Sequence, residues 1–239
     1  AAEQAATELA LADGAKDVSA SFLWTGANGV TIRRSYTLSR GDYALKVRDD
    51  VVNRGTAAWS GHVYRQLSRV PHDIKRSMFN PETFAFSGAA WYTPEDKFQK
   101  AAFSDFLDEK PPATEVQGVW IGMLQHHFAT AWVPRETDQQ VRLETSVTTH
   151  DGVPLYSIRS IAAPLDVAPG ASSTHLSRLW VGPKLQAPMA KLAPSLKLIV
   201  DYGVFTFIAQ PLFWLLSWLH LLLGNWGWAI IAIVVVLKA

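Results

Sequence analysis

Apolar and polar side chains alternate along most of the chain between Val18 and Val181. A period of two is typical of strands that bury one face and expose the other, as in antiparallel sheets. Glycine-containing turn sequences separate the alternating runs, at residues 28–29, 40–42, 53–55, 151–152 and 168–170. The alternation therefore predicts one all-β domain, an antiparallel β-sandwich.

Three runs show the alternation most clearly, and each predicts which side chains face the core. The predicted buried positions are Val18, Ala20, Phe22 and Trp24 in the first run, Tyr43, Leu45, Val47 and Val51 in the second, and Val141, Leu143 and Val147 in the third. We expect little helix in the chain before Pro183, most of it within residues 92–108.

The pattern changes after Pro183. Residues 184–197 hold three lysines among apolar residues and two interrupting prolines, which predicts short helical pieces. Residues 198–239 contain only Asp201 and Lys238 as charged side chains, together with four of the ten tryptophans. A soluble domain does not normally leave such a stretch in water, so this segment predicts contact with a membrane.

Residues 198–223 have helical periodicity with a narrow polar face. The polar residues are spaced by four, seven and three positions, which places them on one side of a helix: Thr206, Gln210, Ser217 and His220. At more than about 20 residues, this segment is long enough to span a bilayer. It is also suited to lying in the interface, with Trp214 and Trp218 as anchors. The periodicity alone leaves both alternatives open.

A second apolar stretch follows the break at residues 224–227 and ends at Lys238. A helix from Trp226 to Lys238 is about 18 Å long, whereas the hydrocarbon core is about 30 Å thick. With Trp226 at one interface, Lys238 lies past the midplane but inside the core. One interpretation makes Lys238 a snorkelling charge that closes a spanning helix. The other makes it a charge kept hydrated in a membrane groove.

Composition narrows the possible functions. The net charge of +1 and the lack of a basic stripe argue against nucleic-acid binding. The absence of Cys excludes disulfides, thiolate metal sites and cysteine nucleophiles. His126 and His127 would point to opposite faces of a strand, so we predict no metal site there. The acidic pairs at 95–96 and 108–109 adjoin turn-forming prolines, which favours solvated loops over catalytic carboxylates.

Several longer segments resemble the YidC family of bacterial membrane protein insertases. Two of them are similar to the family's periplasmic domain, at 88–92 (GAAWY) and 123–132 (MLQHHFATAW). The others are similar to the join between that domain and the membrane core, at 179–186 (LWVGPKLQ), 200–203 (VDYG), 207–213 (FIAQPLF) and 224–227 (GNWG). They occur in the family's order and cover nearly the whole chain.

The resemblance implies a fold and an organisation that periodicity does not show. The sandwich becomes a β-supersandwich of mutarotase-like type, and the expected organisation is a periplasmic β-sandwich domain at 1–183, a helical linker at 184–197, an amphipathic interfacial helix at 198–223 and the first part of a transmembrane helix at 224–239. The tryptophans expected as interface anchors are Trp214, Trp218, Trp226 and Trp228. Lys238 occupies the position of a groove charge that is usually Arg in the family, so the charge is kept and the planar fork is lost.

The function implied by the resemblance is that of an insertase and chaperone, not an enzyme, and it needs no cofactor. It would help inner-membrane proteins to insert and fold, alone or with the protein-translocation channel, through a hydrophilic groove. Expected partners are nascent inner-membrane proteins, the translocation channel and membrane lipid, with the ribosome reached only through parts that this chain lacks. The expected location is the bacterial inner membrane, multi-pass, with residues 1–197 in the periplasm. The alternatives are a periplasmic module that docks translocation-channel partners, and a carbohydrate-binding or carbohydrate-active domain.

Overall fold

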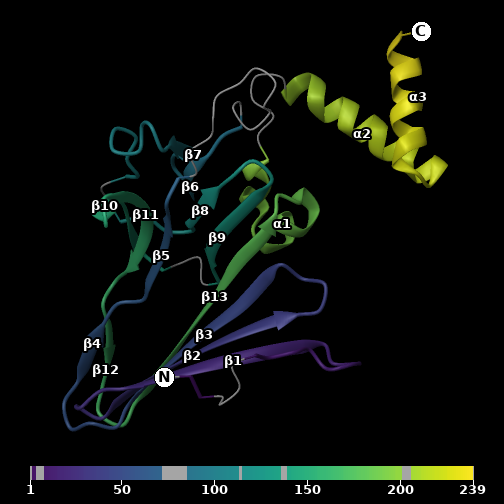
Figure 1. Ribbon diagram of the computed structural model, residues 1–239. Coiled ribbons are helices and arrows are strands. Elements are labelled where there is room, and N and C mark those ends of the chain that lie inside the picture. Colours follow the sequence, from purple (N-terminus) through teal and green to yellow (C-terminus); the bar gives the residue numbers. More distant parts are fainter. Residues whose placement is uncertain are drawn as a thin grey trace. The chain divides into compact units, whose positions relative to one another are not determined.

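The computed structural model describes residues 2–3, 8–71, 85–112, 115–135, 139–200 and 206–238 (Figure 1). The side chains of Pro194, Thr206, Phe207 and Gln210 lie outside this description. The chain divides into two compact units, Ala1–Ile199 and Val200–Ala239. The first unit is built from strands and two short helices, and the second contains two longer helices.

The first unit contains the following described strands. They are β1 (Asp17–Thr25), β2 (Val30–Ser39), β3 (Ala44–Asn53), β4 (Trp59–Gly61), β5 (Tyr64–Arg69), β6 (Gly88–Thr93), β7 (Lys97–Ala102), β8 (Trp120–Leu124), β9 (Phe128–Pro134), β10 (Val141–His150), β11 (Val153–Ala162), β12 (Leu165–Val167) and β13 (Ser172–Pro183). The helices α1 (Gln186–Leu192) and η2, a 3-10 helix (Pro194–Ile199), complete the unit.

These strands form three antiparallel sheets. The largest has eight strands in the order β1-β2-β3-β13-β9-β8-β6-β7, and the others have the orders β10-β11-β5 and β12-β4. The last long strand, β13, lies between β3 and β9 and so joins the two halves of the large sheet (Figure 1). The predicted all-β class with antiparallel pairing is therefore confirmed.

The main core lies between the eight-stranded and the three-stranded sheets. Its buried members come from strands of both sheets, among them Val47 of β3, Ile121 of β8 and Ile158 of β11. Trp91 and Trp132 add large aromatic surfaces to the same cluster. Because each strand gives alternate residues to this interior, the period of two seen in the sequence is the signature of one face buried against a second sheet.

Helices α1 and η2 cover part of the opposite face of the large sheet. Met189 of α1 and Leu196 and Ile199 of η2 pack with Trp120 and Trp180 of the sheet, and all five side chains are almost fully buried. The short helical pieces expected after Pro183 are present, and their apolar side chains belong to the core of the first unit.

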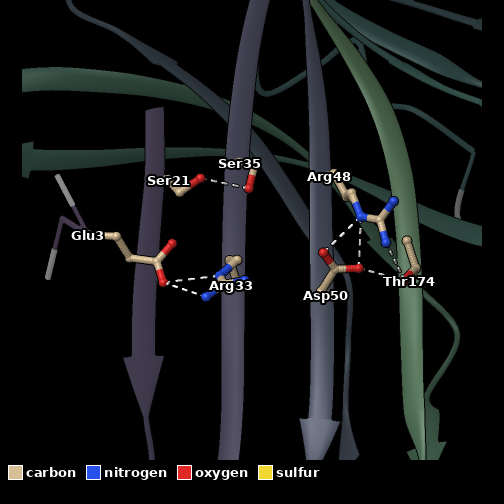
Figure 2. A network of polar contacts seen from close by, with 7 residues as sticks. All are labelled: Glu3, Ser21, Arg33, Ser35, Arg48, Asp50 and Thr174. Atoms are coloured by element: carbon tan, nitrogen blue, oxygen red, sulfur yellow. Dashed lines mark hydrogen bonds and ion pairs between the residues drawn. The ribbon is translucent and has the colours of Figure 1, made fainter. Parts of the chain in front are cut away.

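The same outer face is polar where no helix covers it. Figure 2 shows Arg33 of β2 paired with Glu3, and Arg48 of β3 paired with Asp50, which also accepts a hydrogen bond from Thr174 of β13 at 2.5 Å. Opposite charges and hydroxyl pairs across neighbouring strands stabilise an exposed sheet face modestly. This face is the polar half of the alternation seen in the sequence.

The predicted buried face is wrong at the edge of the sheet. Phe22 and Trp24 of β1 are 45% and 52% exposed, although the alternation places them inside. β1 is an edge strand, and its described residues belong to none of the buried clusters. Conversely, Ala44 falls on the predicted wet face but is buried, because α1 and η2 pack over that part of the sheet.

The helix expected within residues 92–108 is also absent. That segment contains the end of β6, the whole of β7 and the turns that follow. Lys97 begins β7 with φ of 62°, and Thr93 and Lys97 pair across the intervening turn. Pairing with β6 therefore overrides the local preference, because a hairpin next to a long sheet satisfies its backbone groups there.

Candidate functional site

The second unit is a helical hairpin of α2 (Thr206–Leu223) and α3 (Trp226–Lys238). Gly224 ends α2 with φ of +65°, and its N–H donates to the carbonyl oxygen of His220 at 2.8 Å. Asn225 then caps α3, because its Oδ1 accepts hydrogen bonds from the N–H groups of Gly227 at 2.7 Å and Trp228 at 3.4 Å. The break expected at residues 224–227 is therefore shorter than predicted, because only Gly224 and Asn225 lie between the helices and α3 begins at Trp226.

The first helix begins later than the sequence pattern indicates. Leu198 and Ile199 belong to η2, and residues 201–205 lie outside the described residues. Ile199 is 2% exposed and packs in the core of the first unit, which explains why the predicted helix does not start at 198. Among the residues that the structure describes, no helix is both long enough and apolar enough to cross a membrane.

Exposed large apolar side chains are concentrated in the hairpin. Of the expected interface anchors, Trp214 is 69% exposed and Trp228 is 64% exposed, while Trp218 and Trp226 are each 49% exposed. The most exposed of the neighbouring apolar residues is Leu221, at 81%. Contiguous apolar surface of this kind marks a site of contact with a membrane or a partner.

The predicted polar face is described only in its second half. Ser217 donates its hydroxyl to the carbonyl oxygen of Phe213 at 2.7 Å, which satisfies it within α2. The ring of His220 stacks on that of Trp226, with centroids 3.8 Å apart and an angle of 12° between the planes. The structure thus brings together one predicted polar residue and one predicted anchor. The side chains of Thr206 and Gln210 lie outside the described residues.

Lys238 is in the last turn of α3, as the sequence pattern indicates, and its side chain is exposed. A positive charge at a helix C-terminus interacts favourably with the helix dipole. The residues of α3 before it are apolar, so Lys238 is the one charged residue of the hairpin among the residues described.

The sequence patterns did not predict a group of charged residues that lies between the sheets. Asp49 of β3 accepts hydrogen bonds from Arg34 of β2, at 2.5 Å, and from Arg65 of β5. We call these three residues the inter-sheet charge cluster. Asp49 and Arg65 are only 4% and 7% exposed. A gap in the alternation was the available signal, because Asp49 occupies a core-facing position between Val47 and Val51.

Burial and pairing oppose each other at the two arginines of the inter-sheet charge cluster. Burial lowers the pKa of the Arg65 guanidinium, and the neighbouring Asp49 carboxylate only partly offsets this effect. Burial also acts to lower the pKa of Arg34, but the hydrogen bond and charge of Asp49 outweigh it and raise that pKa. Arg65 is held further by Ser177 Oγ at 3.2 Å and by the Trp132 ring, 5.0 Å from its centroid.

The residues considered as metal ligands or as catalytic carboxylates lie in bends and turns. His126 and His127 do not occupy a strand as expected but a bend between β8 and β9, where their rings stack with centroids 3.8 Å apart. Because they are in a bend, the rings lie side by side instead of on opposite faces. The acidic pairs at 95–96 and 108–109 are also in turns, and their side chains are exposed.

Similarity to solved structures is distant. A galactose mutarotase related enzyme from Lactobacillus acidophilus aligns over 76% of this chain and 70% of its own, with 10% identity and a TM-score of 0.46. A TPR-domain containing protein from Parabacteroides distasonis aligns over 73% of this chain and 34% of its own, with 10% identity and a TM-score of 0.47.

Similarity to known sequences is much closer. The family model of the YidC periplasmic domain matches residues 2–215. The membrane protein insertase YidC of Xanthomonas campestris pv. campestris (strain 8004) is 44% identical over 242 residues, 99% of this chain and 41% of the relative. The protein of the same name from Stenotrophomonas maltophilia (strain K279a) is 44% identical over 97% of this chain and 40% of the relative. The chain therefore spans about two fifths of the length of these relatives, and it belongs to the YidC family.

Proposed function

We propose that the full-length protein containing this chain inserts and folds proteins of the bacterial inner membrane, without covalent chemistry or a cofactor. Family membership carries the proposal, since curated relatives at 44% identity are named membrane protein insertases. Its partners are nascent membrane proteins, membrane lipid and the protein-translocation channel. The protein is multi-pass, and residues 1–197 lie in the periplasm.

In this proposal, the two helices of the hairpin have different roles. α2 lies in the membrane interface, where exposed Trp214 and Trp218 reach the headgroup region and the face with Ser217 and His220 meets water. This orientation suits a helix that carries both a broad apolar surface and a narrow polar face. In this position, α2 offers an amphipathic surface along which polar segments of a substrate protein approach the bilayer.

α3 enters the bilayer and carries Lys238 into it. The distance along the helix from Trp226 to Lys238 is about 18 Å, and a charge at that depth is costly unless water or an anionic group reaches it. In a hydrated groove, Lys238 attracts the acidic or polar parts of a substrate. It thereby lowers the free energy of moving those parts across the membrane.

Rescue of cells depleted of their native insertase tests this function. The full-length gene, the native insertase gene and an empty vector are compared, with growth and protease protection of a short-tailed, singly spanning substrate as readouts. We expect the full-length protein to restore both. Residues 1–239 alone should restore neither, because they span only 41% of a relative's length. Failure of a stably expressed full-length protein to restore insertion would refute the proposal.

A further inference from the structure

Two adjoining cavities lie in the sandwich, next to the inter-sheet charge cluster. The larger, of about 230 Å³, is lined by aliphatic side chains and by polar and aromatic residues that include Arg34, Asp49, Trp59 and His62. The smaller, of about 40 Å³, lies beside Arg65, Trp132 and Ser177. Val63 and His175 are in the walls of both, so the two cavities adjoin. We call the two together the cleft, and the smaller cavity its inner end.

Two buried donor groups at this inner end have no partner among the described residues. Arg65 Nη1 is buried without a hydrogen bond, although Nε and Nη2 of the same side chain are bonded to Ser177 and Asp49. His175 Nδ1 is likewise buried without a partner. Buried polar groups in folded proteins are nearly always paired with a protein group, an ordered water or a ligand, so this pair marks a place where a water or a ligand atom binds in the cleft.

Both groups are able to donate in this position. The guanidinium of Arg65 stays protonated, so the two N–H bonds of its Nη1 are always donors. His175 Nε2 is 3.1 Å from Ser173 Oγ. In the tautomer whose Nε2 accepts the hydroxyl hydrogen of Ser173, the ring proton resides on Nδ1, which is then a donor for the cleft.

The net charge of the inter-sheet charge cluster also favours an anionic ligand in the cleft. Arg34 and Arg65 share one carboxylate, that of Asp49, so the cluster has a net positive charge, with the side chain of Arg34 38% exposed and that of Arg65 8% exposed. Asp49 is opposite both Arg34 and His175 in the strand register, so all three project from one row of the large sheet. An anion bound beside this row would complete the charge balance and stabilise the buried arginine.

We propose that this cleft binds a small carboxylate ligand of monosaccharide size. Its carboxylate accepts hydrogen bonds from Arg65 Nη1 and His175 Nδ1 at the inner end. A carboxylate offers two acceptor oxygens, one for each of two donors that come from different sheets. The rest of the ligand fills the larger cavity, which has the volume of about eight waters in the liquid, and packs against Trp59. This binding site is separate from the membrane hairpin and does not depend on the proposed insertion activity.

Titration of histidine-labelled protein tests the proposal. The chain of residues 1–239 is labelled with ¹⁵N in its seven histidines and titrated in detergent with glucuronate, glucose or inorganic phosphate. Glucuronate and glucose have the same ring and differ in the carboxylate. We expect glucuronate to shift the His175 ring signals saturably, glucose to leave them unchanged, and phosphate to bind at least tenfold more weakly than glucuronate. His220, in the other unit, supplies a reference signal.

Two variants and a matched control assign the donors. Arg65→Lys keeps the charge beside Asp49 but removes the second amino group, and it should weaken glucuronate binding at least tenfold. His175→Phe should also weaken glucuronate binding at least tenfold. Because this variant lacks the His175 signal, its binding is followed by the signal of His62. Arg48→Lys makes the same change on the opposite face of β3 and should bind like the parent. The proposal fails if glucuronate gives no shift, if glucose or phosphate binds as well, or if both cleft variants bind like the parent.

Discussion

Asp49 of β3 and Arg65 of β5 form a buried ion pair that joins the two main sheets of the sandwich. Arg34 meets the other carboxylate oxygen of Asp49, so one acidic group holds two cations. A buried ion pair does not by itself stabilise a fold relative to apolar packing, but the loss of one partner leaves a charge without compensation. Loss of either partner should therefore be costly, although the pair lies beside an extensive apolar core between the same sheets.

Removal of the shared carboxylate should destabilise the protein strongly. Asp49→Asn leaves two arginines with a neutral neighbour between the sheets, and we expect a loss of about 3–5 kcal/mol in the free energy of unfolding. Urea unfolding followed by tryptophan fluorescence measures the change. Asp50→Asn is the matched control on the exposed face of the same strand and should cost much less. Equal losses for the two variants would show that burial of the pair is unimportant.

The exposed network on the outer face should contribute to stability in a pH-dependent way. The hydrogen bond from Arg48 lowers the pKa of Asp50, so folding favours its ionised form. The contribution is therefore complete above the pKa of an unfolded Asp, about 3.9, and is lost as the pH falls through the lower folded value.

Arg48→Gln reduces that dependence, because Arg48 makes the largest contribution to the lowered pKa of Asp50, and it tests the sign of the effect. The difference in unfolding free energy between parent and variant should be largest near neutral pH and should shrink below about pH 4, where unfolded Asp gains its proton. Urea unfolding at a series of pH values measures it. A difference that stays constant or grows toward acid pH would contradict the assigned role of Arg48.

The turn of the hairpin should depend on glycine for its backbone conformation. Gly224 has φ of +65°, and a Cβ there would meet no atom within 4 Å, so only backbone strain opposes substitution. Gly224→Ala should cost about 1–2 kcal/mol and speed exchange of the amide at 224 by roughly 5- to 30-fold. Gly224→Asn should cost less, because Asn tolerates this conformation. Equal exchange rates in the two variants would refute this explanation.

The interfacial orientation of α2 can be measured by cysteine labelling in the full-length protein. The chain has no native Cys in residues 1–239, so single-cysteine variants of this part give clean signals. A reagent added from the periplasmic side should modify positions 206, 210 and 217 and spare 205, 212 and 215. Quenching by labelled lipids should place all of them at the same shallow depth. A steady gradient of depth along the helix would show that α2 spans the bilayer.

The sequence is most informative where one physical effect dominates. Alternation predicted the strands around Val47 and Leu143 because each has a second sheet on one side only. It failed at Phe22, Trp24 and Ala44, since the burial of these residues depends on which strand is at the edge and where α1 packs. Those facts arise from pairings between strands far apart in the chain, which local patterns do not contain.

The site residues likewise include some that local sequence signals predict and others that they do not. The turn at Gly224 and the end of α3 at Lys238 follow from local signals, a glycine followed by a capping residue and an apolar run. The contact of Arg65 with Asp49 joins strands of different sheets and has no local signature beyond a charge in a buried register. Because the two strands belong to different sheets, no local pattern shows that these charged side chains meet, and the inter-sheet cleft was missed.

The charge of Lys238 is the central element of the proposed insertion mechanism. A lysine at the centre of a membrane helix costs about 2.5–3.5 kcal/mol on insertion scales, so a position of that depth favours Leu or Ile unless the charge has a role. Lys238→Arg should retain insertion of substrates with acidic translocated segments. Lys238→Leu should impair it while the protein stays folded, because a costly charge has been removed.

The most direct measurement is therefore protease protection of a short-tailed, singly spanning substrate in cells depleted of the native insertase and carrying each full-length variant. A substrate with an acidic translocated segment is compared with one whose segment is uncharged. Our account predicts that Lys238→Leu reduces protection of the acidic substrate well below the level seen with the parent and with Lys238→Arg, and affects the uncharged substrate less. Insertion of the acidic substrate by Lys238→Leu at the parent level would mean that Lys238 is only a helix-end anchor, and would contradict the groove mechanism.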